Sequence, residues 1–476
     1  MIGPYANTPG ARDTVLTPNM DRLMERGVVF DNHFIGSAPC MPARRELMTG
    51  RKEFLWRGWG PMEPFDEHIA SRASAAGAVT AMVTDHYHYW EYPAHGYLER
   101  FDGVTMIRGH EMDILNTDKL PGEGLPGWVE QIERWRPGLG ARYYRNVKQF
   151  GGEEDFFAPK TFSAACDWLD GNHGHPKFLL WTECFDVHEP FHVPEPYRSM
   201  FTDKDPDKYN CWPPYQEGFH GHTAEWWAQA DSDQIDFVRS QYKGKLAMAD
   251  AHLGKLLDRM DKYDLWENTV LILTTDHGHE LGEKERFGKQ SPHYDLSANI
   301  PLIVCAPGVK PARVSALTTA VDIYPTVLEV LDADSAAPHG RSLLPLVRGE
   351  SGGEREAVVY GTFGCGATLT DGNYTYHTGW DADRELNQYT AFMLDPAPGA
   401  VGGRFIPGVG CPVWKIPRAS AAPVAELLFN RVNDPAQDEN VLSERPDIRE
   451  RMRALLRHEM EREGVPDEQY DRLNLR

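Results

Sequence analysis

Three runs of apolar, largely β-branched residues constrain the fold of this chain most strongly. They are VTAMVT at 79–84, FLLWTE at 178–183 and TVLILTT at 269–275, and helical stretches separate them, including a long one near 232–262. Apolar strands that alternate with helices are typical of a parallel sheet covered by helices on both faces. We therefore predict an α/β fold with a large mixed, mainly parallel sheet sandwiched by helices.

Polar residues follow each of these predicted strands. Asp85 and His86 come after the first, residues 184–188 after the second, and Asp276 and His277 after the third. Ligand sites in open α/β sheets lie at the carboxyl ends of the strands. The three strand ends are therefore expected to converge on one site.

The pattern changes after residue 350. The run AVVYGTF at 357–363 precedes a predicted hairpin over 367–377, whose turn is Asp371-Gly372, and an amphipathic helix follows near the end of the chain. We predict a catalytic domain over 1–350 and a smaller C-terminal α+β domain over 351–476, built from an antiparallel sheet and a helix.

Composition excludes several classes of protein. The chain has 476 residues and a formal charge of −22, without a run of Lys or Arg, so a nucleic-acid partner is not expected. No stretch reaches the ~18 apolar residues of a membrane span. The first residues carry neither a basic nor an apolar segment of the kind found in signal peptides, which favours a cytoplasmic location. The seven cysteines form no CxxC pair, which argues against a zinc ribbon.

One motif brings a cysteine, a proline and an arginine together. Cys40, Pro42 and Arg44 form C-x-P-x-R, and Pro42 is predicted to be the first residue of a helix. Cys40 would then lie in the positive field of the helix N-terminus, where Arg44, one turn on, can hold an oxyanion. The alternative is a buried, inert cysteine beside a surface arginine.

The segment around this motif resembles the signature of the type I sulfatases of the alkaline-phosphatase-like superfamily. Cys40, Pro42 and Arg44 match it, as does the Leu-Met-Thr-Gly run at 47–50. The resemblance implies that a formylglycine-generating enzyme oxidises Cys40 to formylglycine. One hydroxyl of the hydrated aldehyde would attack sulfur and displace the alcohol. The other would then expel sulfate as the aldehyde re-forms, which makes the catalysis covalent.

A second block, at 270–308, resembles the metal-binding block of the same family. The resemblance makes Cys40, Asp276 and His277 ligands of a divalent cation, with Ca²⁺ expected and Mg²⁺ or Mn²⁺ as alternatives. It also makes Lys289 a contact of the sulfate group. Together with Arg44, Lys289 would stabilise charge on the substrate oxygens.

Two histidine segments complete the predicted site. FDVHEPFHVPEPY at 185–197 resembles a family segment that places His188 in the substrate pocket, as the general acid on the leaving oxygen. DHYHYW at 85–90 lies where the family has Lys-x-His, so that His88 would bind sulfate and His86 replaces the lysine. Because histidine titrates near neutrality, this replacement weakens fixed positive charge there.

Family members normally begin with an apolar strand that ends in an Asp pair, and those acids bind the same metal. No such strand precedes Asp13, so we expect the chain to lack this N-terminal strand, the sheet to lack a central strand, and the metal to lack one or two carboxylates.

The resemblance implies a hydrolase that cleaves the S–O bond of a small-molecule or glycan sulfate ester. Two alternatives stay open: a phosphonate monoester or phosphodiester hydrolase with the same nucleophile, and a catalytically inactive, truncated scaffold. The sequence specifies neither the natural substrate nor the oligomeric state.

Overall fold

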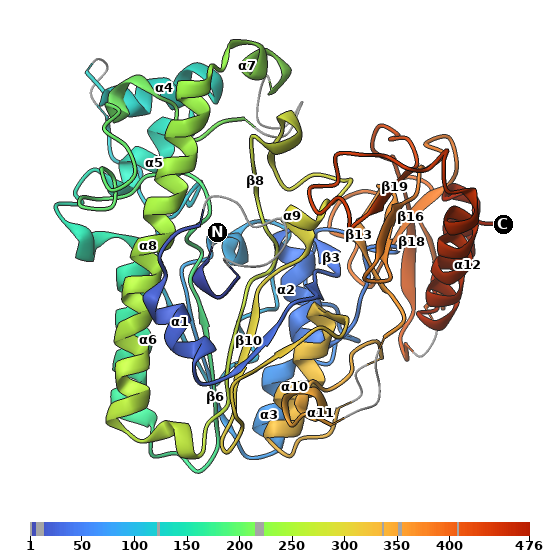
Figure 1. The fold of residues 1–476 in the computed structure, drawn as a ribbon, viewed down its shortest axis with the longest axis horizontal. Coiled ribbons are helices and arrows are strands. Elements are labelled where there is room, and N and C mark those ends of the chain that lie inside the picture. The colour runs from blue at the N-terminus through green and yellow to red at the C-terminus, as the bar shows by residue number, and fades with distance from the viewer. Residues whose placement is uncertain are drawn as a thin grey trace.

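A computed structural model shows a large helix-covered part, which contains the N-terminus, beside a smaller part rich in strands (Figure 1). It describes residues 2–5, 14–120, 124–214, 223–335, 338–350, 355–406 and 409–476. Asp13 and residues 351–354, which follow the predicted domain boundary, lie outside the described residues. The division at 350/351 therefore stays a prediction.

The first sheet is parallel throughout. Its strands β5 (Gly103–Met106), β4 (Val79–Thr84) and β6 (Phe178–Glu183) lie in that order. Thr84 pairs with Met106 on one side and with Glu183 on the other, so the three strands end at the same level. The strands predicted at 79–84 and 178–183 are confirmed.

The second sheet contains antiparallel pairs. Its order is β11 (Ala312–Val314), β1 (Val28–Phe30), β10 (Leu302–Cys305) and β7 (Leu271–Thr274). Strand β10 runs antiparallel to both β1 and β7, whereas β1 and β11 are parallel. The mixed sheet arrangement is confirmed: β5-β4-β6 is its parallel part, whereas β10 runs antiparallel to both of its neighbours, β1 and β7.

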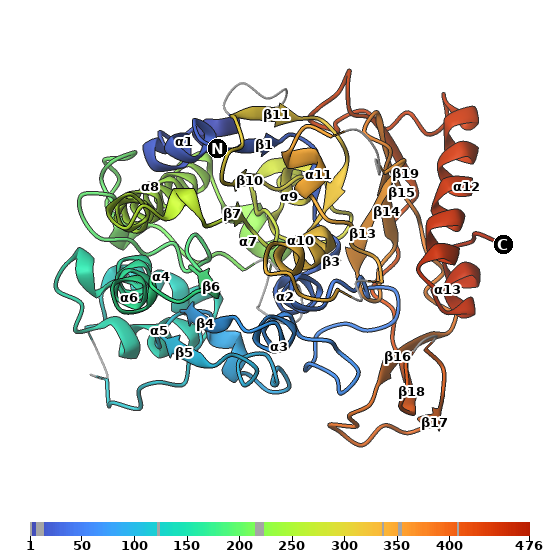
Figure 2. The same cartoon turned by 90° about the horizontal axis from the view of Figure 1, so that it is seen from below.

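Helices cover both faces of these strands, as the sequence predicted (Figure 2). On one face α6 (Phe157–Asn172) packs along α8 (Ser232–Lys262), the long helix expected near 232–262. On the other face lie α2 (Cys40–Thr49), α3 (Ile69–Ala75) and α10 (Ile323–Val330). The remaining short elements of this part are α1 (Pro18–Met24), β2 (His33–Phe34), α4 (Gly127–Trp135), α5 (Leu139–Val147), α7 (Thr223–Gln229), β8 (Glu280–Leu281), β9 (Phe287–Gly288), α9 (Asp295–Ala298), β12 (Thr318–Thr319) and α11 (Leu344–Val347).

The C-terminal part is built from two further sheets and a helix. The larger sheet has the order β19 (Leu427–Asn430), β15 (Tyr374–His377), β14 (Ala367–Thr370), β13 (Val358–Thr362) and β3 (Ser37–Ala38). The smaller one has the order β16 (Leu386–Thr390), β18 (Val413–Arg418) and β17 (Val401–Gly403). The predicted hairpin and amphipathic helix are both present, the helix as α12 (Pro446–Arg462), followed by α13 (Asp467–Arg472). Strand β3 joins the two parts, because it comes from the segment just before Cys40 and pairs with β13.

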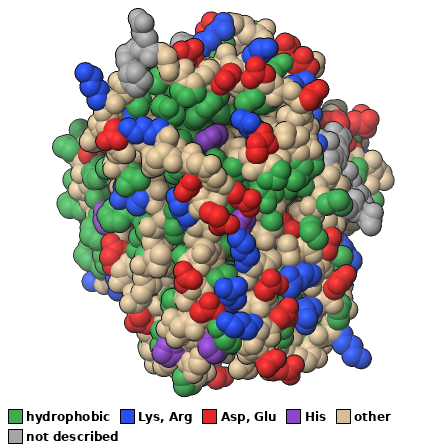
Figure 3. All heavy atoms as spheres, turned by 90° about the vertical axis from the view of Figure 1, so that its left-hand side faces the viewer, with side chains coloured by type: hydrophobic (Ala, Val, Ile, Leu, Met, Phe, Trp, Pro, Cys, Tyr) green, Lys and Arg blue, Asp and Glu red, His purple; other side chains and the backbone are tan. Residues whose placement is uncertain are grey.

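The surface shows no strip of one charge on the face over α4 to α6 and α8, where acidic and basic side chains are interspersed (Figure 3). Among the described helices, none is long and apolar enough to cross a membrane.

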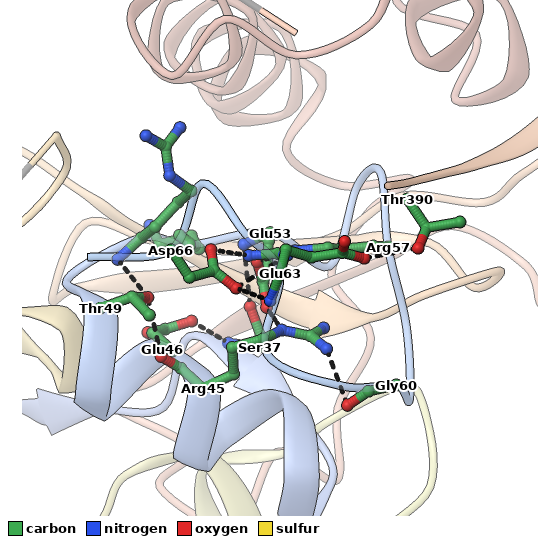
Figure 4. A network of polar contacts seen from close by, with 12 residues as sticks. Ser37, Arg45, Glu46, Thr49, Glu53, Arg57, Gly60, Glu63, Asp66 and Thr390 are labelled. Carbon is green, nitrogen blue, oxygen red and sulfur yellow. Dashed lines mark hydrogen bonds and ion pairs between the residues drawn. The ribbon is translucent and has the colours of Figure 1, made fainter. Parts of the chain in front are cut away.

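A buried ionic network fixes α2 and the loop that follows it (Figure 4). The guanidinium of Arg45 is 1% exposed, pairs with Glu53, and donates to the carbonyl oxygens of Gly58 at 2.6 Å and Gly60 at 3.1 Å. Glu53 also pairs with Arg57, which reaches Asp66 at 2.6 Å. Because each charge has several partners, the network holds the helix that carries Cys40 in one orientation.

We predict that Arg45→Met destabilises the protein by about 3–5 kcal/mol, since Met fills the space but leaves Glu53 and three carbonyl oxygens without this donor. Urea unfolding measures the change. Arg384→Met is the matched control, because the Arg384 side chain is 62% exposed and its loss should stay within about 0.5 kcal/mol. Equal effects of the two substitutions would contradict the structural role of Arg45.

A buried histidine makes stability depend on pH. His68 caps α3 as a neutral ring: its Nδ1 accepts from the Ala70 N–H at 3.1 Å and its Nε2 donates to the Tyr97 carbonyl. Burial lowers the pKa of His68 to about 4 from its ordinary 6.5. The unfolded chain therefore binds a proton at higher pH than the folded chain does, which favours unfolding in acid.

The stabilisation by neutral His68 should be complete above pH 6.5 and be lost as pH falls towards 4, at a cost of roughly 3 kcal/mol. His68→Asn keeps a capping acceptor but removes the titration. Chemical unfolding at several pH values should therefore show a shallower loss for the variant. An identical slope in both proteins would show that His68 does not contribute.

Candidate functional site

The predicted site residues converge at the carboxyl ends of β6 and β7. Cys40 lies at the start of α2, His86 and His88 follow β4, His188 follows β6, and Asp276 and His277 follow β7. Lys289 comes from the loop after β9. Contacts bring these seven residues and Arg44 into one region, where the strand ends were expected to converge.

Cys40 is the first residue of α2, not a residue ahead of it. The expectation that Pro42 begins the helix is wrong by two residues, because the Ala43 N–H already donates to the Pro39 carbonyl oxygen at 3.1 Å. Pro42 is tolerated there since the first N–H groups of a helix have no partner within it. Cys40 still lies at the positive end of the helix, 2% exposed, with its Sγ 3.3 Å from His277 Nε2.

Arg44 links the two sheets. Its Nε donates to Glu183 at the end of β6, and its Nη1 donates to Asp276 Oδ2 at 2.5 Å and to the Cys40 carbonyl oxygen at 3.1 Å. The sequence had assigned Arg44 to an oxyanion; in this structure two carboxylates hold it. Glu183, which also accepts from Thr84 and Tyr89, was missed, although it is the last residue of a predicted strand.

Asp276 and His277 are arranged as metal ligands are. Burial raises the pKa of Asp276, but the positive charge of Arg44 and other neighbours outweighs it, and the pKa lies below its ordinary value. Burial lowers the pKa of His277 to about 4, so its ring is neutral at pH 7. His277 Nδ1 donates to the Gly278 carbonyl oxygen at 2.9 Å, which leaves the lone pair of Nε2 facing Cys40.

Cys40, Asp276 and His277 offer ligand atoms within 4.8 Å of one another, which fits a divalent cation. These three do not complete a calcium site, because Ca²⁺ takes ~6–8 oxygen ligands and the group contains one carboxylate. Among the residues that the structure describes, two further groups bring ligand atoms equally close together: Cys40 with His86 and His88, and Glu111 with His188 and Glu189.

His188 and Lys289 form a close pair. Lys289 Nζ lies 2.6 Å from His188 Nε2, and His188 Nδ1 donates to the Glu189 carbonyl oxygen at 2.9 Å. Burial lowers the pKa of Lys289, but the negative charge of neighbours such as Glu189 outweighs it and raises the pKa to about 12. Burial holds the pKa of His188 well below its ordinary value. The proton between Lys289 Nζ and His188 Nε2 therefore stays on Lys289, and His188 Nε2 accepts the hydrogen bond.

His86 and His88 lie together beside Cys40, with ligand atoms of the three residues within 4.8 Å of one another. His86 is 0% exposed and packs against Phe185 with ring centroids 4.2 Å apart. Burial holds its pKa well below the ordinary value, so it adds no positive charge at pH 7, as expected for a histidine in the place of a lysine. His88 Nδ1 lies 2.7 Å from Glu91 Oε2, which orients the ring.

Sequence reasoning also missed a buried acidic pair behind His188. Glu111 Oε2 lies 3.6 Å and Glu189 Oε2 3.4 Å from His188 Nδ1, and both residues are 1% exposed. Glu189 is held by His279 as well, at 3.2 Å. Its position next to His188 could have marked it, whereas nothing in the local sequence marked Glu111.

We predict that Asp276→Asn weakens Ca²⁺ binding by about tenfold or more, because a hard cation prefers a charged oxygen ligand. Isothermal titration calorimetry with CaCl₂ measures the change. Asp438→Asn is the control, since the Asp438 side chain is 64% exposed and pairs with Lys284. Unchanged affinity in Asp276→Asn would remove Asp276 from the ligand set.

Several known proteins resemble the chain. It is 27% identical over 382 residues to the multifunctional alkaline phosphatase superfamily protein PehA of Trinickia caryophylli, covering 71% of this chain and 72% of that protein. It is 25% identical over 366 residues to human arylsulfatase K, covering 71% and 62%. It is 23% identical over 368 residues to the choline-sulfatase of Rhizobium meliloti (strain 1021), covering 71% and 68%.

Solved structures share the fold over almost the whole chain. The phosphonate monoester hydrolase of Agrobacterium radiobacter superposes with a TM-score of 0.64 at 20% identity, covering 96% of this chain and 94% of that one. A 2-O GAG sulfatase superposes with a TM-score of 0.63 at 16% identity, covering 97% and 89%. The family model named Sulfatase matches residues 8–333, more than half of the 476 residues. The chain therefore belongs to the sulfatase family, within the alkaline-phosphatase-like superfamily.

Proposed function

We propose that this protein hydrolyses the sulfate monoester of a small molecule or glycan, with Cys40 converted to formylglycine as the nucleophile. One observation carries the proposal: Cys40 lies at the N-terminus of α2 with His277 Nε2 3.3 Å away and Arg44 one turn on, in a chain of the sulfatase family. Relatives named arylsulfatase K and choline-sulfatase support a sulfate ester as the substrate.

The unmodified thiol of Cys40 is a poor nucleophile in this position. Burial raises its pKa, although Lys289 and Arg44 act in the opposite direction. Thiol reactivity depends on the thiolate, which a raised pKa makes scarce at neutral pH. The environment of Cys40 is therefore unfavourable for a cysteine nucleophile, and we propose a formylglycine-generating enzyme as the partner that modifies the side chain.

The charges around Cys40 support a requirement for a metal ion. Lys289 and Arg44 contribute positive charge there, and Asp276 and Glu189 contribute negative charge. The charges of these four side chains cancel, so by themselves the four give no net attraction for an anionic ester. A divalent cation at Asp276 and His277 would supply the missing positive charge, and we propose Ca²⁺, with Mg²⁺ or Mn²⁺ as alternatives.

A bound metal ion and a formylglycine at position 40 would together supply a polarised site with an activated hydroxyl. Arg44 and Lys289 would stabilise charge on the substrate oxygens. Lys289 carries the proton that it shares with His188. We therefore propose that the Lys289–His188 pair, with His188 at the leaving oxygen, protonates that oxygen. His88, oriented by Glu91, would contact the sulfate, and neutral His86 would shape the pocket.

The first test is the mass of the tryptic peptide that contains residue 40, from protein made with a formylglycine-generating enzyme. We expect the CH₂–SH group to be replaced by an aldehyde, and the aryl sulfatase activity of Cys40→Ala to fall by about 10³-fold or more. Cys411→Ala is the matched control and should stay within about twofold, because Cys411 lies between β17 and β18 in the C-terminal part. An unaltered thiol in active protein would contradict the proposed nucleophile.

A second candidate function is hydrolysis of a phosphonate monoester, because a hydrolase of that class shares the fold. Rates on a 4-nitrophenyl sulfate and on a 4-nitrophenyl phenylphosphonate, each with Ca²⁺ and with Mn²⁺, separate the two. Faster sulfate turnover with Ca²⁺ supports the sulfatase. Faster phosphonate turnover overturns the choice of substrate, and no turnover of either ester by formylglycine-containing protein supports an inactive scaffold.

A further inference from the structure

A buried histidine beside Cys40 has hydrogen-bonding groups that its surroundings leave unused. Among the residues that the structure describes, neither ring nitrogen of His86 has a hydrogen-bond partner, although the side chain is fully buried. The ring packs against Phe185 and Tyr89, with centroids 4.2 Å and 5.1 Å away. Leaving a buried polar atom without a partner is costly, and native proteins rarely do so without a functional reason. The ring of His86 is therefore a candidate to bind a ligand.

Backbone contacts fix the segment that carries His86 and His88. The His86 N–H donates to Thr84 Oγ1 at 3.0 Å, and the Glu91 N–H donates to the His88 carbonyl oxygen at 3.0 Å. The two imidazole rings lie with their centroids 4.9 Å apart. Cys40 reaches the same place from the start of α2, so that its Sγ and one nitrogen of each ring lie within 4.8 Å of one another. Three donor atoms from two distant segments therefore converge.

This donor set suits a borderline cation better than a hard one. Thiolate sulfur and neutral imidazole nitrogen are typical ligands of Zn²⁺, whereas Ca²⁺ prefers oxygen ligands. In a tetrahedral zinc site, bond lengths of ~2.0–2.3 Å place the ligand atoms roughly 3.3–3.8 Å apart. The separations around Cys40, at most 4.8 Å, are close to these values without a metal. Small movements of the side chains would complete the geometry.

Two carboxylates support a metal at His88. His88 Nδ1 lies 2.7 Å from Glu91 Oε2, so Glu91 can accept the Nδ1–H and leave the lone pair of Nε2 for a metal ion. Histidines that bind metal ions commonly have such a carboxylate partner. Glu111 Oε2 lies 3.7 Å from His88 Nε2, is buried, and has no hydrogen-bond partner among the described residues. This oxygen is available for a fourth position on the metal.

From these observations we propose that, in protein whose Cys40 is not converted, Cys40 Sγ, His86 and His88 bind one Zn²⁺. Glu111 completes the coordination. The thiol loses its proton to solvent as the Zn–S bond forms, and no oxidation or reduction takes place. Conversion of Cys40 to formylglycine removes the sulfur atom and with it the zinc site. The chain would thus bind different metals before and after its modification.

The inference is independent of the proposed function, because it concerns the thiol form and its test measures metal binding. Protein made without a formylglycine-generating enzyme, with Cys40 confirmed by mass, is titrated with Co²⁺ as a spectroscopic substitute for Zn²⁺. We expect an ultraviolet charge-transfer band from sulfur to cobalt, together with the visible bands of a tetrahedral ion. Both should reach their maximum at one equivalent and disappear when Zn²⁺ is added. The absence of the sulfur band would overturn the proposal.

Two variants separate this site from the group that contains Asp276, because the two share Cys40. Phe at position 86 fits the aromatic surroundings but offers no lone pair, so His86→Phe should weaken Co²⁺ binding by roughly tenfold or more. Asp276→Asn is the matched control and should keep both cobalt bands. The reverse pattern, or equal loss in the two variants, would place the ion at Asp276 and overturn the proposal.

A second measurement needs no variant and covers the case in which His86→Phe does not fold. X-ray absorption at the zinc edge counts the ligands in the thiol protein loaded with one equivalent of Zn²⁺. We expect one sulfur at ~2.3 Å and at least two imidazole nitrogens at ~2.0–2.1 Å. A ligand shell without sulfur, or with a single imidazole, would overturn the proposal.

Discussion

The ion pairs of one buried guanidinium hold the site together. Arg44 reaches Glu183 at the end of β6 and Asp276 just after β7, two strands from different sheets with no hydrogen bond between them. Its third partner, the carbonyl oxygen of Cys40, lies one turn back on its own helix. A single side chain thus links the two strand ends with the start of α2. Breaking a pair of this kind is costly, because a buried charge is left uncompensated.

Two adjacent arginines on α2 contact different parts of the structure. Successive residues of an α-helix point about 100° apart, so Arg44 and Arg45 face different sides. Arg44 faces the strand ends, and Arg45 faces the loop that contains Glu53 and Gly60 (Figure 4). The network around Arg45 extends through Arg57 and Asp66, and Glu63 of the same loop accepts from Thr390 Oγ1 in β16 at 2.5 Å. The orientation of the helix that carries Cys40 therefore depends on contacts with the C-terminal part.

Desolvation decides the protonation states in the site. Burial lowers the pKa of His86, His188 and His277, so these rings are neutral at pH 7 and can accept protons or bind metal ions. Lys289 and Asp276 keep their charges despite burial, because each has neighbours of opposite charge. The site thus combines neutral imidazoles with a few fixed charges, and such perturbed pKa values cluster at functional sites.

The sequence by itself determined the elements and much of the site. The apolar runs at 79–84 and 178–183 became β4 and β6, since apolar, β-branched residues favour buried strands. The C-x-P-x-R motif and the polar residues after each strand predicted the residues that meet around Cys40, because ligand sites of α/β proteins lie at the carboxyl ends of strands, although here those strands belong to two sheets. Periodicity likewise located α8 and α12.

Only the tertiary structure decided which strands pair and what each charge contacts. Antiparallel pairing of β10 with β7 depends on the path of the loop between them, which periodicity does not record. Glu111 and Glu183 reach the site from segments far from the motif, so their roles follow from distance in space. The same holds for the pairing of β6 with β4: the apolar sequence of each strand indicates burial, but which strand becomes its neighbour is decided only in the assembled sheet.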